Sequence, residues 1–224
     1  MQLATYSIVA KNNRTKEFGV ASATAAPCVG AFLPFAEEAV GAIATQAWVN
    51  VNIGFVGLEL MRSGFSVKTA IETVLADDGG RARRQVIGID HSSVHGYTGQ
   101  HCTDPKGHML GGDFAVAGNI LADVGVLDEM ASAFKKAKGE LGNRMICALE
   151  AGEAAGGDHR GKMSSVLLVA SPTPKLNHNI RVDISQDPVN ELRALHSRLE
   201  RMQEELGDDD GGEVLRRKVR RVAD

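Results

Sequence analysis

The stretch ALEAGEAAGGDHRGKMSSVLLV, residues 148–169, decides the fold class because it holds the end of a helix, a loop and a strand in one run. The helical period of segment 141–155 predicts a helix, and the apolar run at 164–170 predicts a buried strand. Between them lies a glycine-flanked loop that carries three polar residues, Asp158, His159 and Arg160. The run therefore predicts a helix followed at once by a buried strand, with an acid and a cation in the loop that joins them.

Outward from this run, the predicted elements come in groups. Apolar or alternating runs predict strands at 3–10, 18–26, 38–48, 85–90, 93–98 and 113–118. The 3.6-residue period predicts helices at 53–62, from the cap Ser66 to the stop signal at 77–80, and at 124–138. The order is strands, two helices, strands, two helices, strand. This order predicts an α+β fold, in which paired helices pack on antiparallel sheet, and not the strict alternation of a parallel sheet.

Composition narrows the class of protein. The 224 residues are 43% hydrophobic and 24% charged, enough to bury one sizeable core or two small ones. The net charge of −3 gives no overall attraction to nucleic acid or to an anionic membrane, and no apolar run approaches the ~20 residues that span a bilayer. The first residues lack the pattern of a secretory signal, and three widely spaced cysteines fit reduced thiols. We expect a cytoplasmic protein with neither nucleic acid nor membrane as a partner.

The C-terminal part differs in composition. Asp187 and Pro188 begin a predicted helix at 188–206, in which apolar residues recur at 3-4-3-4 spacing at Leu192, Leu195, Leu199, Met202 and Leu206. A coiled-coil seam for a partner chain and a terminal helix laid on its own domain both fit two heptads, and we favour the second. The predicted organisation is one domain at 1–206 and a flexible polar and basic tail at 207–224. Contact of this tail with an acidic partner is the alternative.

Some residue patterns point to chemistry and others exclude it. Thr5 and Ser7 share one face of the first strand, but neither hydroxyl is nucleophilic unless a base lies beside it. Asn119 ends the strand at 113–118, where its amide or a backbone N–H could stabilise an oxyanion. Asp158 and Arg160 could converge on a substrate, although an ordinary turn with a solvated ion pair is the other interpretation.

Histidines gather in one region, but their spacing does not predict a metal site. His91, His95, His101 and His108 lie near Cys102 without any zinc-binding pattern, so we interpret them as surface residues of hairpins and loops. Neither a phosphate-binding glycine loop nor a G-x-S-x-G elbow is present. We therefore expect no metal and no cofactor.

Several long stretches match a known family. They include TYSIVAKN at 5–12, VGAIATQAWVN at 40–50, GHMLGGDFAVAGNIL at 107–121, the run at 148–169 and RVDISQDPVNELRAL at 181–195. On these motifs, the chain resembles the family known as domain of unknown function 1028, a group of Ntn-hydrolase-like proteins. The resemblance implies a four-layer αββα sandwich with mainly antiparallel sheets. It also implies a homo-oligomer, since small proteins of this fold often associate.

The resemblance further implies a relation to N-terminal nucleophile (Ntn) hydrolases, which cleave amide bonds in small molecules or peptides. In those enzymes the first residue attacks, and its own α-amino group acts as the base. Thr5 takes the nucleophile position. Asn119 would lie near the oxyanion, while Asp158 and Arg160 would orient the nucleophile or the substrate. Three further residues would line the substrate site, namely Gln46, His108 and Ser7.

One departure from the Ntn pattern matters. Thr5 follows Met-Gln-Leu-Ala, so the mechanism requires cleavage of the Ala4–Thr5 bond. Three hypotheses therefore remain open: an amide hydrolase that uses Thr5 after processing, a catalytically silent protein that binds a small ligand or a protein partner, and a hydrolase that uses Ser7 or Thr5 with His108 or His159 as base. Only the third needs an imidazole within about 2.6–3.2 Å of the hydroxyl.

Overall fold

The computed structural model describes residues 2–3 and 5–203, and within them every pairing between strands is antiparallel. Sheet A has the order β1-β5-β6-β7, with β4 also paired to β5. Its strands are β1 (Gln2–Leu3), β4 (Pro34–Glu37), β5 (Gly41–Trp48), β6 (Arg84–Ile89) and β7 (Val94–Thr98). Sheet B has the order β11-β10-β3-β2-β9-β8. Its strands are β2 (Thr5–Asn12), β3 (Glu17–Thr24), β8 (Gly107–Leu110), β9 (Phe114–Gly118), β10 (Ser164–Ala170) and β11 (His178–Val182).

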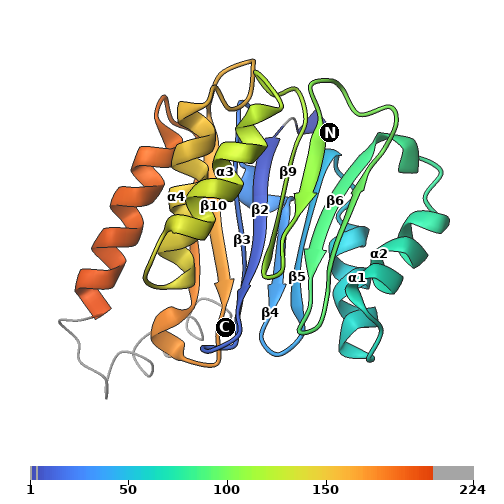
Figure 1. The fold of residues 1–224 in the computed structure, drawn as a ribbon, viewed down its shortest axis with the longest axis horizontal. Helices are drawn as coiled ribbons and strands as arrows, with labels where there is room; N and C mark the ends of the chain where they lie inside the picture. Colours follow the sequence, from blue (N-terminus) through green and yellow to red (C-terminus); the bar gives the residue numbers. More distant parts are fainter. Residues whose placement is uncertain (1, 4, 204–224) are drawn as a thin grey trace, which may run out of the picture.

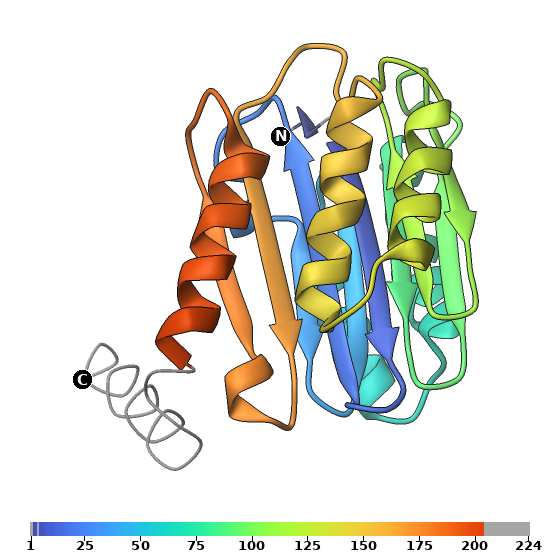
Figure 2. The same cartoon turned by 60° about the vertical axis from the view of Figure 1, so that its left-hand side comes forward.

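Helices cover the outer face of each sheet, and the two sheets face each other (Figure 1). Sheet A carries α1 (Asn52–Arg62) and α2 (Val67–Ala76). Sheet B carries α3 (Gly125–Lys136), α4 (Leu141–Ala154) and a helical segment at 188–203, which stand side by side in Figure 2. Three short 3₁₀ helices complete the described elements: η1 (Val29–Ala31), η2 (Arg81–Arg83) and η3 (Pro174–Leu176). The protein is thus an α+β protein with antiparallel sheets.

Three apolar clusters separate the layers. The cluster between the sheets is built largely of small and branched side chains, including Val9, Val20, Ala42, Ala44, Ala115 and Ala117. The second lies between sheet B and its helices, and includes Ile8, Met130, Phe134, Leu149 and Leu167. The third lies between sheet A and its helices, and includes Ile43, Ile53, Ile71, Leu75 and Val86. Because strand side chains alternate, β2 sends Ile8 to the helices of sheet B and Val9 to the opposite sheet.

The strongest sequence patterns predicted their elements closely. The strand at 164–170 is β10 with the predicted bounds, and the helices at 124–138 and 141–155 are α3 and α4 with slightly later starts or earlier ends. The strand expected at 38–48 begins only at Gly41, which has a φ of 154° and follows a turn. Four strands were not predicted: β1, β4, β8 and β11. Each has five residues or fewer, and their sequences lack clean alternation of apolar side chains.

The C-terminal helix packs on its own domain. Val189 and Leu192 belong to the cluster beneath the helices of sheet B, whereas Leu195 and Met202 are exposed. Part of the heptad pattern, Leu192, is therefore explained by packing of the helix on sheet B and α4. The predicted last turn at 204–206 and the predicted tail at 207–224 lie outside the described residues. Across the residues that are described, none of the helices has the length and apolar character needed to cross a membrane.

Candidate functional site

A group of buried polar side chains interrupts the apolar layer between the sheets at the end where β2 begins. Ser7 on β2, Gln46 on β5, Gln85 on β6 and Asn119 after β9 are all fully buried. Ser7 lies two residues before Val9, so alternation turns both side chains toward sheet A. We call these four residues the amide network.

The amide network joins the two sheets through side-chain hydrogen bonds. The Ser7 hydroxyl donates to Gln46 Oε1. Gln46 Nε2 donates to Gln85 Oε1 at 2.7 Å, and Asn119 Nδ2 donates to the same oxygen at 2.9 Å. Gln85 is therefore the centre of the network, although no sequence pattern had marked it.

The other end of the Gln85 amide is anchored to sheet B and to β7. Its Nε2 donates to the carbonyl oxygens of Gly107 and Gly118, each at 2.9 Å, and to Thr98 Oγ1 at 3.0 Å. The Thr98 hydroxyl in turn lies 2.8 Å from His108 Nδ1. Burial lowers the pKa of His108, so at neutral pH the ring is uncharged and can accept the Thr98 proton. The bonds thus continue from the buried network to the half-buried His108.

Thr5 lies beside this network, at the point where the chain crosses from one sheet to the other. Residues 2–3 pair with β5 in sheet A, opposite Trp48 and Ala47, whereas Thr5 opens β2 in sheet B. Thr5 is fully buried, and its carbonyl oxygen accepts a bond from the Asn119 backbone N–H at 3.0 Å. The residue expected to be the nucleophile is therefore adjacent to the residue expected near the oxyanion.

The glycine-rich loop lies beside the end of β3, the strand that pairs with Thr5. Asp158 is 3% exposed, forms a β-bridge with Leu121, and accepts a bond from the Ala25 backbone N–H at 2.9 Å. Ala25 follows Thr24, which is the cross-strand partner of Thr5. The φ values of the loop glycines Gly156, Gly157 and Gly161 are 110°, 53° and 113°, values that L side chains rarely adopt.

Arg160 completes this loop as the partner of Asp158. Its backbone N–H and its Nε reach Asp158 Oδ1 at 3.0 and 3.1 Å, and its Nη2 reaches Oδ2 at 2.8 Å. The acid is thus held on two sides, by Arg160 and by the backbone next to Thr24. The pair is more than a solvated turn, because the carboxylate is buried and ties the loop to β3.

Two strained residues lie next to the amide network. Ala47 follows Gln46 with a φ of 64°, and Ile120 follows Asn119 with a φ of 52°. A left-handed conformation costs a non-glycine residue roughly 1–2 kcal/mol. Such strain concentrates at functional sites, where the surrounding structure holds a side chain in a required direction. Lys16, Cys28 and Ala39 also have φ values near 60°, so left-handed backbone is not confined to the network.

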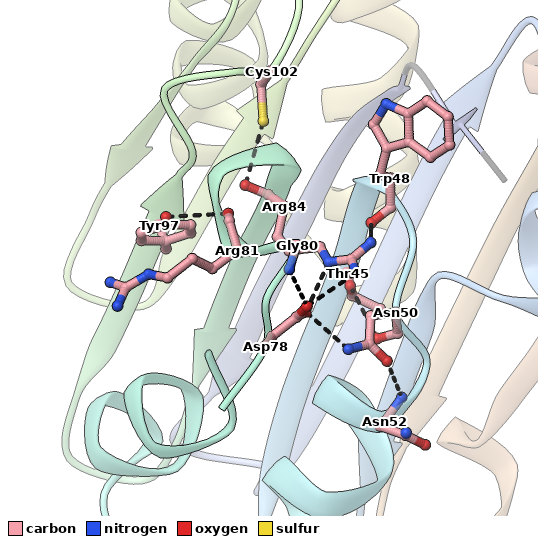
Figure 3. A network of polar contacts seen from close by, with 10 residues as sticks. All are labelled: Thr45, Trp48, Asn50, Asn52, Asp78, Gly80, Arg81, Arg84, Tyr97 and Cys102. Atoms are coloured by element: carbon pink, nitrogen blue, oxygen red, sulfur yellow. Dashed lines mark hydrogen bonds and ion pairs between the residues drawn. The ribbon is translucent and has the colours of Figure 1, made fainter. Parts of the chain in front are cut away.

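A second polar network fixes the end of β5 that pairs with residues 2–3 (Figure 3). Arg84 donates to the Trp48 carbonyl oxygen at 2.6 Å and pairs with Asp78 at 2.8 Å. Hydrogen bonds from Arg84, opposed by burial and aided by Asn50, hold the pKa of Asp78 at about 2. The end of β5 that lies opposite residues 2–3 is therefore tied to β6 and to Asp78 by Arg84.

The structure thus groups the residues that the sequence had singled out. Ser7, Gln46 and Asn119 share one network, and His108 is joined to it through Thr98. The hydroxyl of Ser7 is bonded to an amide oxygen and not to an imidazole, so the geometry gives no support to Ser7 with a histidine base. His159 is exposed, and its backbone N–H donates to the Ile120 carbonyl oxygen.

Sequence reasoning missed Gln85 and Thr98. The available signal was an amide at the head of the apolar run QVIGID, since a polar side chain in a buried strand must find partners. Three or more metal-ligating side chains do not come together anywhere in residues 2–3 and 5–203.

Fold and site together define an α+β protein with two facing antiparallel sheets, helices on both outer faces, and a buried amide network at one end of the layer between the sheets. The chain belongs to the family of unknown function DUF1028, whose model matches residues 5–192. A crystal structure of a protein from Silicibacter pomeroyi, of the same family, is similar with a TM-score of 0.82 and 30% sequence identity. The similarity covers 87% of this chain and 85% of that one. Among curated proteins, none matches this chain.

Proposed function

We propose that this protein is an amide hydrolase of the N-terminal nucleophile type, acting on a small molecule or a peptide through Thr5 once the Ala4–Thr5 bond is cut. The observation that carries the proposal is the position of Thr5. It opens a central strand of sheet B, next to Asn119 of the amide network and opposite Thr24, whose neighbour Ala25 is bonded to Asp158. The layering of helices and sheets supports a relation to the Ntn fold.

The chemistry requires a free α-amino group on Thr5. An α-amine has a pKa near 8, so its neutral form can take the proton of Thr5 Oγ1 at physiological pH. The oxygen then attacks the substrate carbonyl carbon, and the amine product leaves with that proton. Water hydrolyses the resulting ester, which releases the acid and restores the Thr5 hydroxyl. Asp158 and Arg160 orient the backbone beside Thr24, and hence the strand that faces Thr5.

The segment before Thr5 is attached in a way that permits its loss. Residues 2–3 contribute two register positions to sheet A, opposite Trp48 and Ala47. Every other strand pairing among the described residues involves only residues from Thr5 onward. Cleavage therefore removes little of the sheet and opens the edge of β5 next to the new amino group.

Hydrolysis of a panel of fluorogenic amides by the purified protein tests the proposal. We expect activity from the wild type, loss of at least 100-fold in Thr5→Ala, on the order of what removing a nucleophile costs, and residual activity in Thr5→Ser. The matched control is Thr73→Ala, a hydroxyl on the exposed face of α2. Activity that is equal in Thr5→Ala and in the wild type would exclude Thr5 as the nucleophile.

A catalytically silent binding protein is the second candidate, and the burial of Thr5 in the uncut chain favours it. In that case the uncut form is the working form. Thr5→Ala would then keep both stability and ligand binding, and no member of the amide panel would be hydrolysed by any variant.

A further inference from the structure

The orientation of the amide network is determined by two backbone carbonyl groups. A carbonyl oxygen can only accept hydrogen bonds, so the Gln85 group that faces Gly107 O and Gly118 O must be its NH₂. The Gln85 oxygen then points the other way, toward Gln46 and Asn119. A flipped Gln85 amide would place its oxygen against two carbonyl oxygens.

This orientation fixes Asn119 as well. Its side chain meets Gln85 Oε1, so it must offer its Nδ2 there, which it does at 2.9 Å. The other atom of the Asn119 amide, Oδ1, is then directed away from Gln85. It is buried and has no hydrogen-bond partner among the described residues. An unpaired buried acceptor costs free energy of folding, and an N–H or O–H donor at Oδ1 would remove that cost. The described part of the uncut chain supplies no such donor.

The neighbour of Asn119 indicates the donor. The Asn119 backbone N–H donates to the Thr5 carbonyl oxygen at 3.0 Å, so the two residues lie opposite each other at the ends of β9 and β2. Residues opposite each other on one face of an antiparallel pair have Cβ atoms about 4.5–5.5 Å apart. In the uncut chain the Thr5 nitrogen is an amide with one N–H. Cleavage of the Ala4–Thr5 bond converts it to an amino group with two or three.

We propose that Asn119 Oδ1 is the acceptor that holds the α-amino group of Thr5 after cleavage. The inference rests on the proposed function, because it requires the cut chain. It makes Asn119 a positioning residue, which binds the amine and directs its lone pair toward Thr5 Oγ1. Asn119 Oδ1 is an acceptor, whereas the oxyanion role expected from the sequence needs a donor. That role stays a prediction for the backbone N–H groups nearby.

The titration of the Thr5 amine in a chain that begins at Thr5 tests this inference. Such a chain, 5–224, is obtained by placing Thr5 directly after the initiator Met, and ¹⁵N-labelled threonine reports the amine by NMR. Burial lowers the pKa of an amine, and a hydrogen bond to its charged form raises it. We therefore expect Asn119→Leu to lower the amine pKa by about one unit, and Asn119→Asp to raise it by about one unit or more.

The control is Gln46→Leu, which removes the other donor to Gln85 Oε1 but not the proposed contact. It should leave the amine pKa within a few tenths of a unit. Two charged groups, Asp158 and Arg160, lie on the side of β3 next to Thr5, and Tyr6 lies on the opposite face of β2. All three are the same in every variant. An amine pKa that is unchanged in both Asn119 variants would overturn the inference, as would a 5–224 chain that does not fold.

A second measurement uses folded protein only and needs no titration. Asn119→Leu should destabilise 5–224 more than it destabilises freshly purified 1–224 whose intact mass shows it to be uncut, because only the cut chain loses the contact to the amine. Equal destabilisation contradicts the inference. Neither measurement requires turnover, so a shifted amine pKa without hydrolysis would count against the proposed function alone, and hydrolysis with an unshifted pKa against this inference alone.

Discussion

The two ends of the layer between the sheets bury polar groups in different ways. At the end of β2 away from Thr5, Lys11 donates its Nζ to the carbonyl oxygens of Asp90 and His91 at 2.9 and 2.7 Å. The Asp90 carboxylate accepts from the backbone of Val67, at 2.7 Å, and from the backbone and hydroxyl groups of Ser92 and Ser93. At the other end, the amide network leaves Asn119 Oδ1 without a partner among the described residues.

We interpret the Lys11 end as structural and the Thr5 end as the functional one. Burial alone would raise the pKa of Asp90, but the hydrogen bonds that it accepts hold the pKa below its ordinary value. Lys11 joins the two sheets at that end, and the Asp90 carboxylate joins sheet A to α2 on its outer face. The Thr5 end also joins the sheets, yet within the described chain it keeps Asn119 Oδ1 as an unpaired acceptor. Functional sites are one place where natural sequences keep such a cost.

A buried histidine pair is the hardest test of this comparison, because it has unpaired atoms and lies away from Thr5. The rings of His178 on β11 and His196 on the helix at 188–203 meet edge to face with centroids 4.8 Å apart. Within the described residues their nitrogens lack hydrogen bonds, although His196 Nδ1 lies 3.4 Å from Glu200, an ion-pair distance without hydrogen-bond geometry. Burial lowers the pKa of both to about 4, aided by their proximity for His178 and by Arg193 for His196.

We expect this pair to make the largest pH-dependent contribution to stability. The folded pKa values lie below the unfolded value of about 6.5, so the stability is present above pH 6.5 and is lost as the pH falls toward 4. Because the two rings are coupled, the expected loss for the pair is a few kcal/mol, about 1.4 kcal/mol for each pKa unit that is titrated. Urea unfolding at pH 7 and at pH 4.5 measures it. The double variant His178→Leu, His196→Leu should flatten the profile, while His101→Leu, on the surface, should not.

Gln85→Leu should have the next largest effect. It removes the acceptor of Gln46 and Asn119 and the donor to two carbonyl groups, and each unpaired buried group costs about 1–3 kcal/mol. We expect a loss of about 4 kcal/mol in the free energy of unfolding and loss of cleavage at Ala4–Thr5. Retained cleavage in folded Gln85→Leu would show that the network is only structural.

Lys11→Met should be destabilising but functionally neutral. It leaves the carbonyl oxygens of Asp90 and His91 without the Lys11 donor. We expect the free energy of unfolding to fall by about 3 kcal/mol. The chain should nevertheless be cut at Ala4–Thr5 and hydrolyse amides at temperatures where it stays folded. Lys68→Met on the exposed face of α2 is the control for loss of a charge. A folded Lys11→Met variant without cleavage would contradict the division between the two ends.

Thr98→Val should have the smallest effect. The change keeps the shape of the side chain and removes the hydroxyl between Gln85 and His108, which costs about 1 kcal/mol in urea unfolding. We expect cleavage at no more than a severalfold lower rate, because the Gly107 and Gly118 carbonyl groups still orient Gln85. A complete loss of cleavage would instead assign a direct role to the pair of Thr98 and His108.

The sequence predicted what local patterns determine. The helices α3 and α4 and the strand β10 were found because their apolar residues recur at one period over many positions. Strands β8 and β11 are short and depend on their neighbours, so no local pattern marks them. Asn119 and Gln46 were singled out by motif, but Gln85 was not, because its partners come from β5, β7, β8 and β9, and only the fold brings these together.

The state of the Ala4–Thr5 bond distinguishes the hydrolase from the silent binding protein. Intact-mass measurement of freshly purified and of incubated protein, with Thr5→Ala alongside, reads it without any assumption about the substrate. We predict that the wild type loses its first four residues over time. We also predict that Thr5→Ala stays at full length, because it lacks the hydroxyl that would attack the Ala4 carbonyl carbon. A wild type that keeps all residues from Met1 under every condition, while showing the same stability and fold, would contradict the account.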